Sequence, residues 1–182
     1  MMEALFSVDA LWFTAFSFYD ATRAQWSVVA GWLLLNLVMH ELGHAGASLA
    51  FGRPVEAVRL GARPVLLRIR SRRVGEWRIG LPLPNGATYY DDAVTLARWR
   101  AWLCTAAGPG ANLALAAGAM FAHAFSPSIL TFACFWIAFS AAIEGLVPLH
   151  GNADGTKLWR GALRGVGLAC GWLMFRFRTT KL

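Results

Sequence analysis

The stretch that decides the fold is Trp26–Phe51, which runs WSVVAGWLLLNLVMHELGHAGASLAF and in which Glu41 carries the only formal charge. A helix needs about 20 predominantly apolar residues to cross the roughly 30 Å of hydrocarbon in a bilayer. Because this stretch exceeds that length, we predict a membrane-spanning helix here.

The rest of the chain is also strongly apolar. Of its 182 residues, 57% are hydrophobic and 15% are charged, which is more apolar surface than one small soluble core can hide. From Ala101 to Ile143 there is no Asp, Glu, Lys or Arg, and only Phe125-Ser126-Pro127-Ser128 interrupts the run. This pattern predicts two helices joined by a tight turn. Segments 5–19 and 161–177 are shorter or interrupted by charge, so they fit either a crossing or a surface position.

Between residues 53 and 90 the pattern changes to short β-type pieces. We predict strands at 55–60, 65–70 and 74–81, because apolar and charged residues alternate there, as in Leu67-Arg68-Ile69-Arg70. Pro82 and Pro84 indicate an edge strand or the end of a strand, and Asn85-Gly86 predicts a turn. The expected fold is therefore a mainly α polytopic membrane bundle of about four spans, forming one domain over 1–182, with a β-rich insertion at the membrane surface.

The positive charge is concentrated in this same region. The net charge is +7, and ten of the seventeen basic residues are arginines between Arg53 and Arg100. Basic loops next to membrane spans collect on the cytoplasmic side, where they also meet anionic lipid. We predict that loop 53–100 is cytoplasmic and that the lipid bilayer is a partner. No recognition motif accompanies the arginines, so nucleic acid is not an expected partner.

The predicted helix of residues 26–51 contains a metal-binding pattern, His40-Glu41-Leu42-Gly43-His44. Helical positions four apart differ by about 40° around the axis and about 6 Å along it, so His40 and His44 share one face. Two neutral imidazoles placed in this way can bind one Zn²⁺, while Glu41 acts as general base toward a water molecule. Ionisable groups inside a span are costly, which favours a functional role for all three.

A catalytic zinc site typically has three protein ligands, so a third must come from elsewhere in the chain. We predict Asp154, which follows the apolar run that ends near residue 147. If the basic loop is cytoplasmic, two crossings after it return the chain to the same side as the two histidines. The alternatives for this position are Glu144, His150, Asp91 and Asp92.

Three motifs in order resemble the site-2 protease family of intramembrane metalloproteases. They are Val38–Ala45, Ala107-Gly108-Pro109-Gly110-Ala111-Asn112, and Val147-Pro148 ahead of Asp154-Gly155. The resemblance implies that His40, His44 and Asp154 bind zinc and that Glu41 is catalytic. The third motif departs from the family pattern, since Gly145 stands where the family usually has Asn and Ala153 where it usually has Leu.

These features together predict an intramembrane zinc metalloprotease, a hydrolase with one Zn²⁺ per chain. It would cut peptide bonds of membrane-associated proteins near the cytoplasmic leaflet. Two alternatives remain at this point: a catalytically inactive membrane scaffold or regulator of the same fold, and a metal-handling membrane transporter. The sequence predicts neither the substrate nor the oligomeric state.

Overall fold

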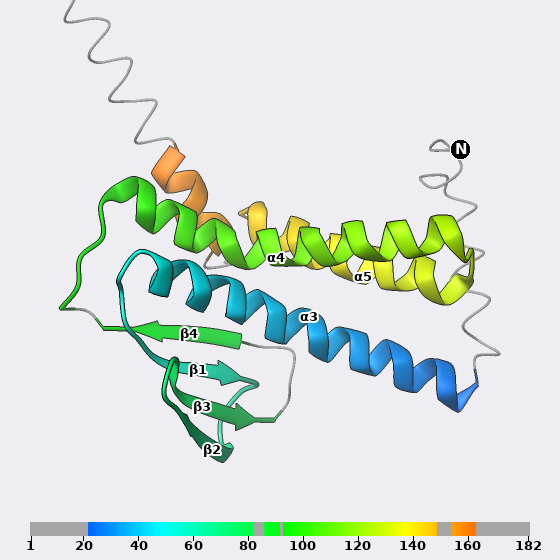
Figure 1. The fold of residues 1–182 in the computed structure, drawn as a ribbon, viewed down its shortest axis with the longest axis horizontal. Coiled ribbons are helices and arrows are strands. Elements are labelled where there is room, and N and C mark those ends of the chain that lie inside the picture. The colour runs from blue at the N-terminus through cyan, green and yellow to red at the C-terminus, as the bar shows by residue number, and fades with distance from the viewer. Residues whose placement is uncertain (1–21, 82–85, 92, 149–153, 163–182) are drawn as a thin grey trace, which may run out of the picture.

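The computed structural model describes residues 22–81, 86–91, 93–148 and 154–162. These residues form a mainly helical structure with a small sheet beside it (Figure 1). The three long helices are α3 (Arg23–Ala50), α4 (Arg98–Phe125) and α5 (Ile129–Leu146), and residues 154–162 are also helical. Segment 5–19 and most of segment 161–177, whose position we left open, lie outside the described residues.

Helix α3 covers the predicted first span except for its last residue, Phe51. It begins with a capping box, in which the Thr22 hydroxyl accepts a hydrogen bond from the Gln25 backbone N–H. It ends before Gly52, whose positive φ of 76° favours glycine. Helices α3 and α5 are both long and apolar enough to cross a membrane, which makes them two candidate spans.

Helices α4 and α5 form the predicted helical pair. The chain turns at residues 126–128, and Ser128 caps α5 by accepting a hydrogen bond from the Thr131 backbone N–H. Small residues let the two helices approach closely, since Ala116, Ala119 and Ala138 are buried between them. Helix α4 contacts both α3 and α5 and so holds the helices together.

The sheet has the strand order β2-β3-β1-β4. Its strands are β1 (Val55–Leu60), β2 (Val65–Ser71), β3 (Gly75–Gly80) and β4 (Gly86–Tyr90). Strand β1 pairs parallel with β3 and antiparallel with β4, while β2 and β3 are antiparallel. The three predicted strands are confirmed. The predicted turn at Asn85-Gly86 is wrong at Gly86, which begins β4, a strand that we did not predict.

One side of the sheet packs on α3. Val58 and Leu60 of β1 are buried against Ala45, with Leu37 and Val38 at the margin of the same cluster. Strand β4 also contacts α3. In Figure 1 the sheet lies along the half of α3 that leads to β1, which is the half that contains His40 and His44. This packing places an end strand of the sheet beside the predicted metal site.

Candidate metal centre

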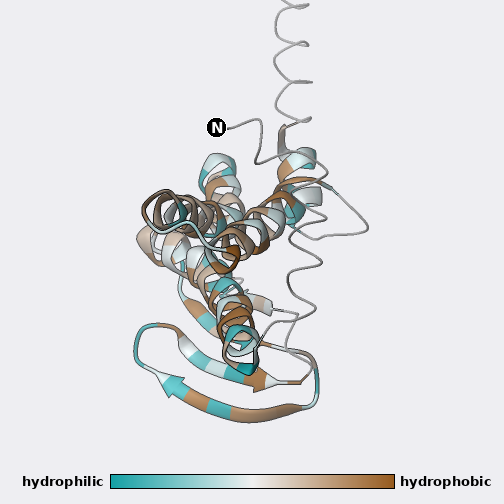
Figure 2. Cartoon of the chain, turned by 90° about the vertical axis from the view of Figure 1, so that its right-hand side faces the viewer, coloured by the Kyte–Doolittle hydropathy of each residue, from teal (hydrophilic) through white to brown (hydrophobic). Residues whose placement is uncertain are grey.

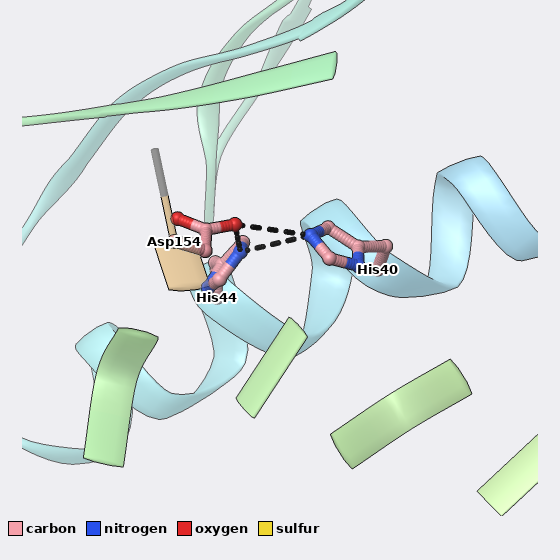
Figure 3. Close-up of side chains that lie close together, drawn as sticks. All are labelled: His40, His44 and Asp154. Atoms are coloured by element: carbon pink, nitrogen blue, oxygen red, sulfur yellow. Dashed lines mark hydrogen bonds and ion pairs between the residues drawn. The ribbon is translucent and has the colours of Figure 1, made fainter. Parts of the chain in front are cut away.

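Two histidines and one aspartate converge from separate parts of the chain. His40 and His44 lie one turn apart on α3, and Asp154 comes from the helical segment 154–162 (Figure 3). The Asp154 Oδ2 atom is 3.3 Å from His40 Nε2 and 3.0 Å from His44 Nε2. The two Nε2 atoms are 3.2 Å apart. Three ligand-type atoms therefore surround one point.

A contact with the backbone determines which ring nitrogen of His44 carries a hydrogen. Its Nδ1 lies 2.8 Å from the Cys104 backbone carbonyl oxygen, and a carbonyl oxygen can only accept a hydrogen bond. Nδ1 therefore carries the hydrogen, and Nε2 of the neutral ring has a lone pair. The Nε2 atom faces a carboxylate oxygen at 3.0 Å, so this contact holds either a proton on Nε2 or a cation between the two atoms.

His40 is held by Asn112 of α4. The Asn112 Nδ2 atom is 3.2 Å from His40 Nδ1, while Oδ1 of the same amide is buried and has no hydrogen-bond partner. The nitrogen and oxygen of an amide are assigned from the surrounding network. Rotating the amide by 180° makes Oδ1 the acceptor for a hydrogen on Nδ1 and leaves the His40 Nε2 lone pair for a metal. Metal-binding histidines usually have such a partner on the second ring nitrogen.

Asp154 is tied to both histidines. Partial burial acts to raise the pKa of its carboxyl, but the hydrogen bonds with His40 and His44 outweigh burial and hold that pKa well below its usual range. The carboxylate is therefore anionic near neutral pH. Its side chain is 23% exposed and that of His40 is 17% exposed, so the cluster can be reached from solvent.

Two of the other residues considered for the third position, Glu144 and Asp91, are not part of this cluster. Glu144 is exposed on α5 and does not belong to the cluster of His40, His44 and Asp154. Asp91 accepts a hydrogen bond from the Ala93 backbone N–H, which makes it a turn residue ahead of α4. Asp92 and His150 lie outside the described residues.

The three donor atoms fit a zinc ion. Zinc is bound by histidine nitrogen and carboxylate oxygen at about 2.0–2.2 Å, usually as a tetrahedron, which places neighbouring ligand atoms about 3.3–3.5 Å apart. The separations of 3.0, 3.2 and 3.3 Å are within a few tenths of an ångström of that range. Two imidazoles and one carboxylate are also a ligand set that zinc accepts, with a fourth position open.

Glu41 lies next to this cluster, beneath β4. Its side chain is almost fully buried, and Oε2 accepts a hydrogen bond from the Thr88 hydroxyl at 2.7 Å. A side chain at Gly86 would collide with the Glu41 carboxylate, so the backbone of β4 lies directly against it. Two residues of an unpredicted strand thus fix the position of the carboxylate.

Glycines make room for the histidine rings and for the close approach of the helices. A Cβ at Gly108 would collide with the His44 ring, and one at Gly43 would collide with the backbone of α4 at Ala107. A Cβ at Gly145 would collide with Pro109 and touch His40. The glycine at 145, which departs from the family pattern, is required by the packing of α5 on α4.

Sequence reasoning missed two residues of this site. Thr88 lies in the strand that was not predicted, and its only signal is that it stands in a short stretch of strand-forming residues before Tyr89. Asn112 stands in the second of the three motifs, but the motif gave it no role. Its place in a span was the available signal, since a polar group there needs a partner.

Comparison with known families agrees with this geometry. The model of peptidase family M50 matches residues 28–147, which is more than half of the chain and includes His40, Glu41, His44 and Asn112. Asp154 follows the matched range, so its place in the site rests on the geometry. No curated protein matches the chain. The match shows that this chain belongs to peptidase family M50, the site-2 protease family.

Proposed function

We propose that this chain is an intramembrane zinc metalloprotease that hydrolyses peptide bonds of membrane-associated proteins. The observation that carries the proposal is the convergence of His40 Nε2, His44 Nε2 and Asp154 Oδ2 beside Glu41. The two histidines and Glu41 lie on α3, which is long and apolar enough to cross a membrane. In this proposal the three converging residues hold one Zn²⁺ per chain, and Glu41 is the catalytic residue.

The chemistry supplied by a bound zinc ion is Lewis acidity toward a carbonyl oxygen and a water molecule. The protein supplies the proton transfers. Glu41 takes a proton from the attacking water and delivers it to the leaving amine of the cleaved peptide bond. The Thr88 hydroxyl, by donating to Oε2, holds the carboxylate in one orientation and leaves Oε1 for the proton.

The location follows from the position of the site along α3. Ala50, the last residue of the helix, is six residues after His44, which is about 9 Å along the helix axis. We propose that α3, α4 and α5 all cross the bilayer, as part of a single domain with about four spans. With the basic loop 53–100 on the cytoplasmic side, the site lies within the cytoplasmic half of the membrane.

The substrate must reach this site in an extended form, because a helix hides its peptide bonds in its own hydrogen bonds. Strand β4 is the last strand in the sheet order, so its outer edge has no strand partner among the described residues. It is also the strand that lies against Glu41. We propose that an unwound substrate segment adds to this edge as a further strand, which brings its peptide bonds to the metal.

Comparative proteomics of cells that carry wild-type or Glu41→Gln protein tests the proposed activity. The wild type should generate a fragment of at least one membrane protein that is absent with the variant. Zinc content of the two purified proteins is the control, because the substitution should remove the base and leave the metal. Identical fragment patterns with equal zinc content would reject the protease and favour an inactive scaffold of the same fold.

A further inference from the structure

The face of the sheet that points away from α3 carries a row of arginines. Arg78 of β3 stands in register with Arg59 of β1 on one side and with Arg68 of β2 on the other. Successive residues of a strand point to opposite faces, and the neighbouring pair Val58 and Trp77 lies on the face packed against α3. The three arginines therefore lie together on the opposite face.

Such a row is unfavourable without a counter-charge, because like charges directly opposite each other in a sheet are destabilising. Glu76 is the one acid paired with the row in the described part of the chain: it accepts a hydrogen bond from Arg78 at 2.6 Å and lies 3.9 Å from Arg68. The hydrogen bond from Arg78 holds the pKa of Glu76 below its usual range, so Glu76 stays ionised near neutral pH. One carboxylate does not balance three guanidinium groups.

The row lines a pocket of about 380 Å³. Arg63, in the turn between β1 and β2, adds a fourth guanidinium, and Tyr89 of β4 forms part of the wall. The guanidinium carbons of Arg59 and Arg78 each lie 5.8 Å from the centre of the Tyr89 ring, which holds both groups in place. The Nε of Arg59 is buried and has no hydrogen-bond partner among the described residues. The hydrogen-bonding capacity of this pocket-lining guanidinium is therefore not fully used within the described residues.

A phosphate group matches these features. Guanidinium groups bind phosphate through pairs of parallel hydrogen bonds, and a phosphate has enough oxygens to accept from several arginines at once. Between residues 53 and 81 there are eight arginines and two glutamates, so this part of the chain attracts anions strongly.

The surroundings of the pocket favour a phospholipid as the source of the phosphate. Strand β2, which contributes Arg68, also carries Leu66, Leu67 and Ile69 with exposed fractions of 63%, 49% and 48%. Leu67 and Ile69 alternate with Arg68 and so point to the other face of this edge strand. Figure 2, which colours each residue by hydropathy, shows hydrophilic and hydrophobic residues mixed along the strands of the sheet. An edge strand with both charged and exposed apolar residues suits the boundary between headgroups and acyl chains. The other face of the sheet packs on α3, a candidate membrane span, which keeps the pocket near the bilayer.

We propose that the pocket between Arg59, Arg63, Arg68 and Arg78 binds the phosphate of an anionic phospholipid headgroup. This site is separate from the metal centre and lies on the opposite face of the sheet from α3 and Glu41. A bound headgroup neutralises the arginine row and anchors the sheet, including β4, relative to the membrane.

The test uses the full chain purified in detergent micelles, with thermal unfolding measured during titration with phosphatidylglycerol, phosphatidylcholine or inorganic phosphate. Phosphatidylglycerol should raise the unfolding temperature at lower concentrations than either of the others. Arg59→Gln should raise the half-saturating phosphatidylglycerol concentration about tenfold or more, as expected for a lost charged hydrogen bond. Arg59→Lys keeps the charge without the fork and should lose part of the affinity.

Arg72→Gln is the matched control, since Arg72 is exposed in the turn between β2 and β3 and does not line the pocket. It removes the same charge and should leave the half-saturating concentration within about twofold of wild type, as expected for a screened surface charge. If Arg59→Gln fails to fold, Arg63→Gln replaces it. Equal stabilisation by both lipids, equal losses in the Arg59 and Arg72 variants, or an equal effect of inorganic phosphate would each overturn the proposal.

Discussion

The clearest consequence of the site geometry concerns Asn112. Asn112→Ala removes the buried amide that holds His40 Nδ1 and leaves that partly buried ring nitrogen without this partner. A buried polar group without a partner costs about 1–3 kcal/mol, and losing such a contact to a metal-binding histidine typically weakens metal affinity about 10–100-fold. We therefore expect the zinc dissociation constant to rise by about one to two orders of magnitude, with the fold retained.

The assay is competition for zinc between the detergent-purified protein and a chromophoric chelator, with circular dichroism to verify helix content. Asn36→Ala is the matched control, because Asn36 is a buried asparagine of α3 whose amide donates to the Trp32 carbonyl, away from the metal centre. Asn112→Asp keeps an oxygen acceptor and should retain wild-type affinity or exceed it. Wild-type affinity in Asn112→Ala, or an equal loss in Asn36→Ala, would refute the assigned role.

Three further predictions follow from the same contacts. Gly108→Ala should displace the His44 ring and lower zinc occupancy, which metal analysis measures. Gly110→Ala should leave zinc occupancy unchanged, because a Cβ there meets no neighbouring atom within 4 Å. Equal occupancy in the two variants would contradict the packing. Thr88→Val should reduce peptide cleavage about tenfold or more with unchanged zinc content, and Thr88→Ser should restore it; a loss of zinc in Thr88→Val would point to a structural role. Asp154→Asn should weaken zinc binding about tenfold or more, while Glu144→Gln on α5 should not; the reverse outcome would assign the third ligand to Glu144.

The helices could be predicted because their signals are local. The long apolar run around His40 and the uncharged run broken at residues 125–128 correspond to α3, α4 and α5. Strand β4 could not be predicted in the same way. Its first residue, Gly86, is the second residue of an Asn-Gly pair that comes after two prolines, and these residues indicate a turn. The pairing with β1 and the contact with α3 decide its structure, and neither is visible in the sequence.

The residues of the site likewise divide into those with a local sequence signal and those placed by tertiary contacts. His40 and His44 are found from spacing, because one helical turn places them together. Asp154 is 110 residues from His44, and only topology and family resemblance suggested it. The contacts of Asn112 and Thr88 with the cluster depend on the distances between α3, α4 and β4, which no local pattern reports. Sequence reasoning therefore proposed ligands and a base, while the groups that orient them required the structure.

The measurement that tests the central claim most directly is X-ray absorption at the zinc edge of the purified, zinc-loaded chain, with metal content determined on the same sample. We predict one zinc per chain, bound by two imidazoles and additional oxygen at about 2.0–2.2 Å and without sulfur. Replacing Asp154 by Asn should change the oxygen shell and keep both imidazoles. A sulfur ligand, a single imidazole, or a natively folded chain that takes up no zinc would contradict the assignment of His40, His44 and Asp154 as the metal site.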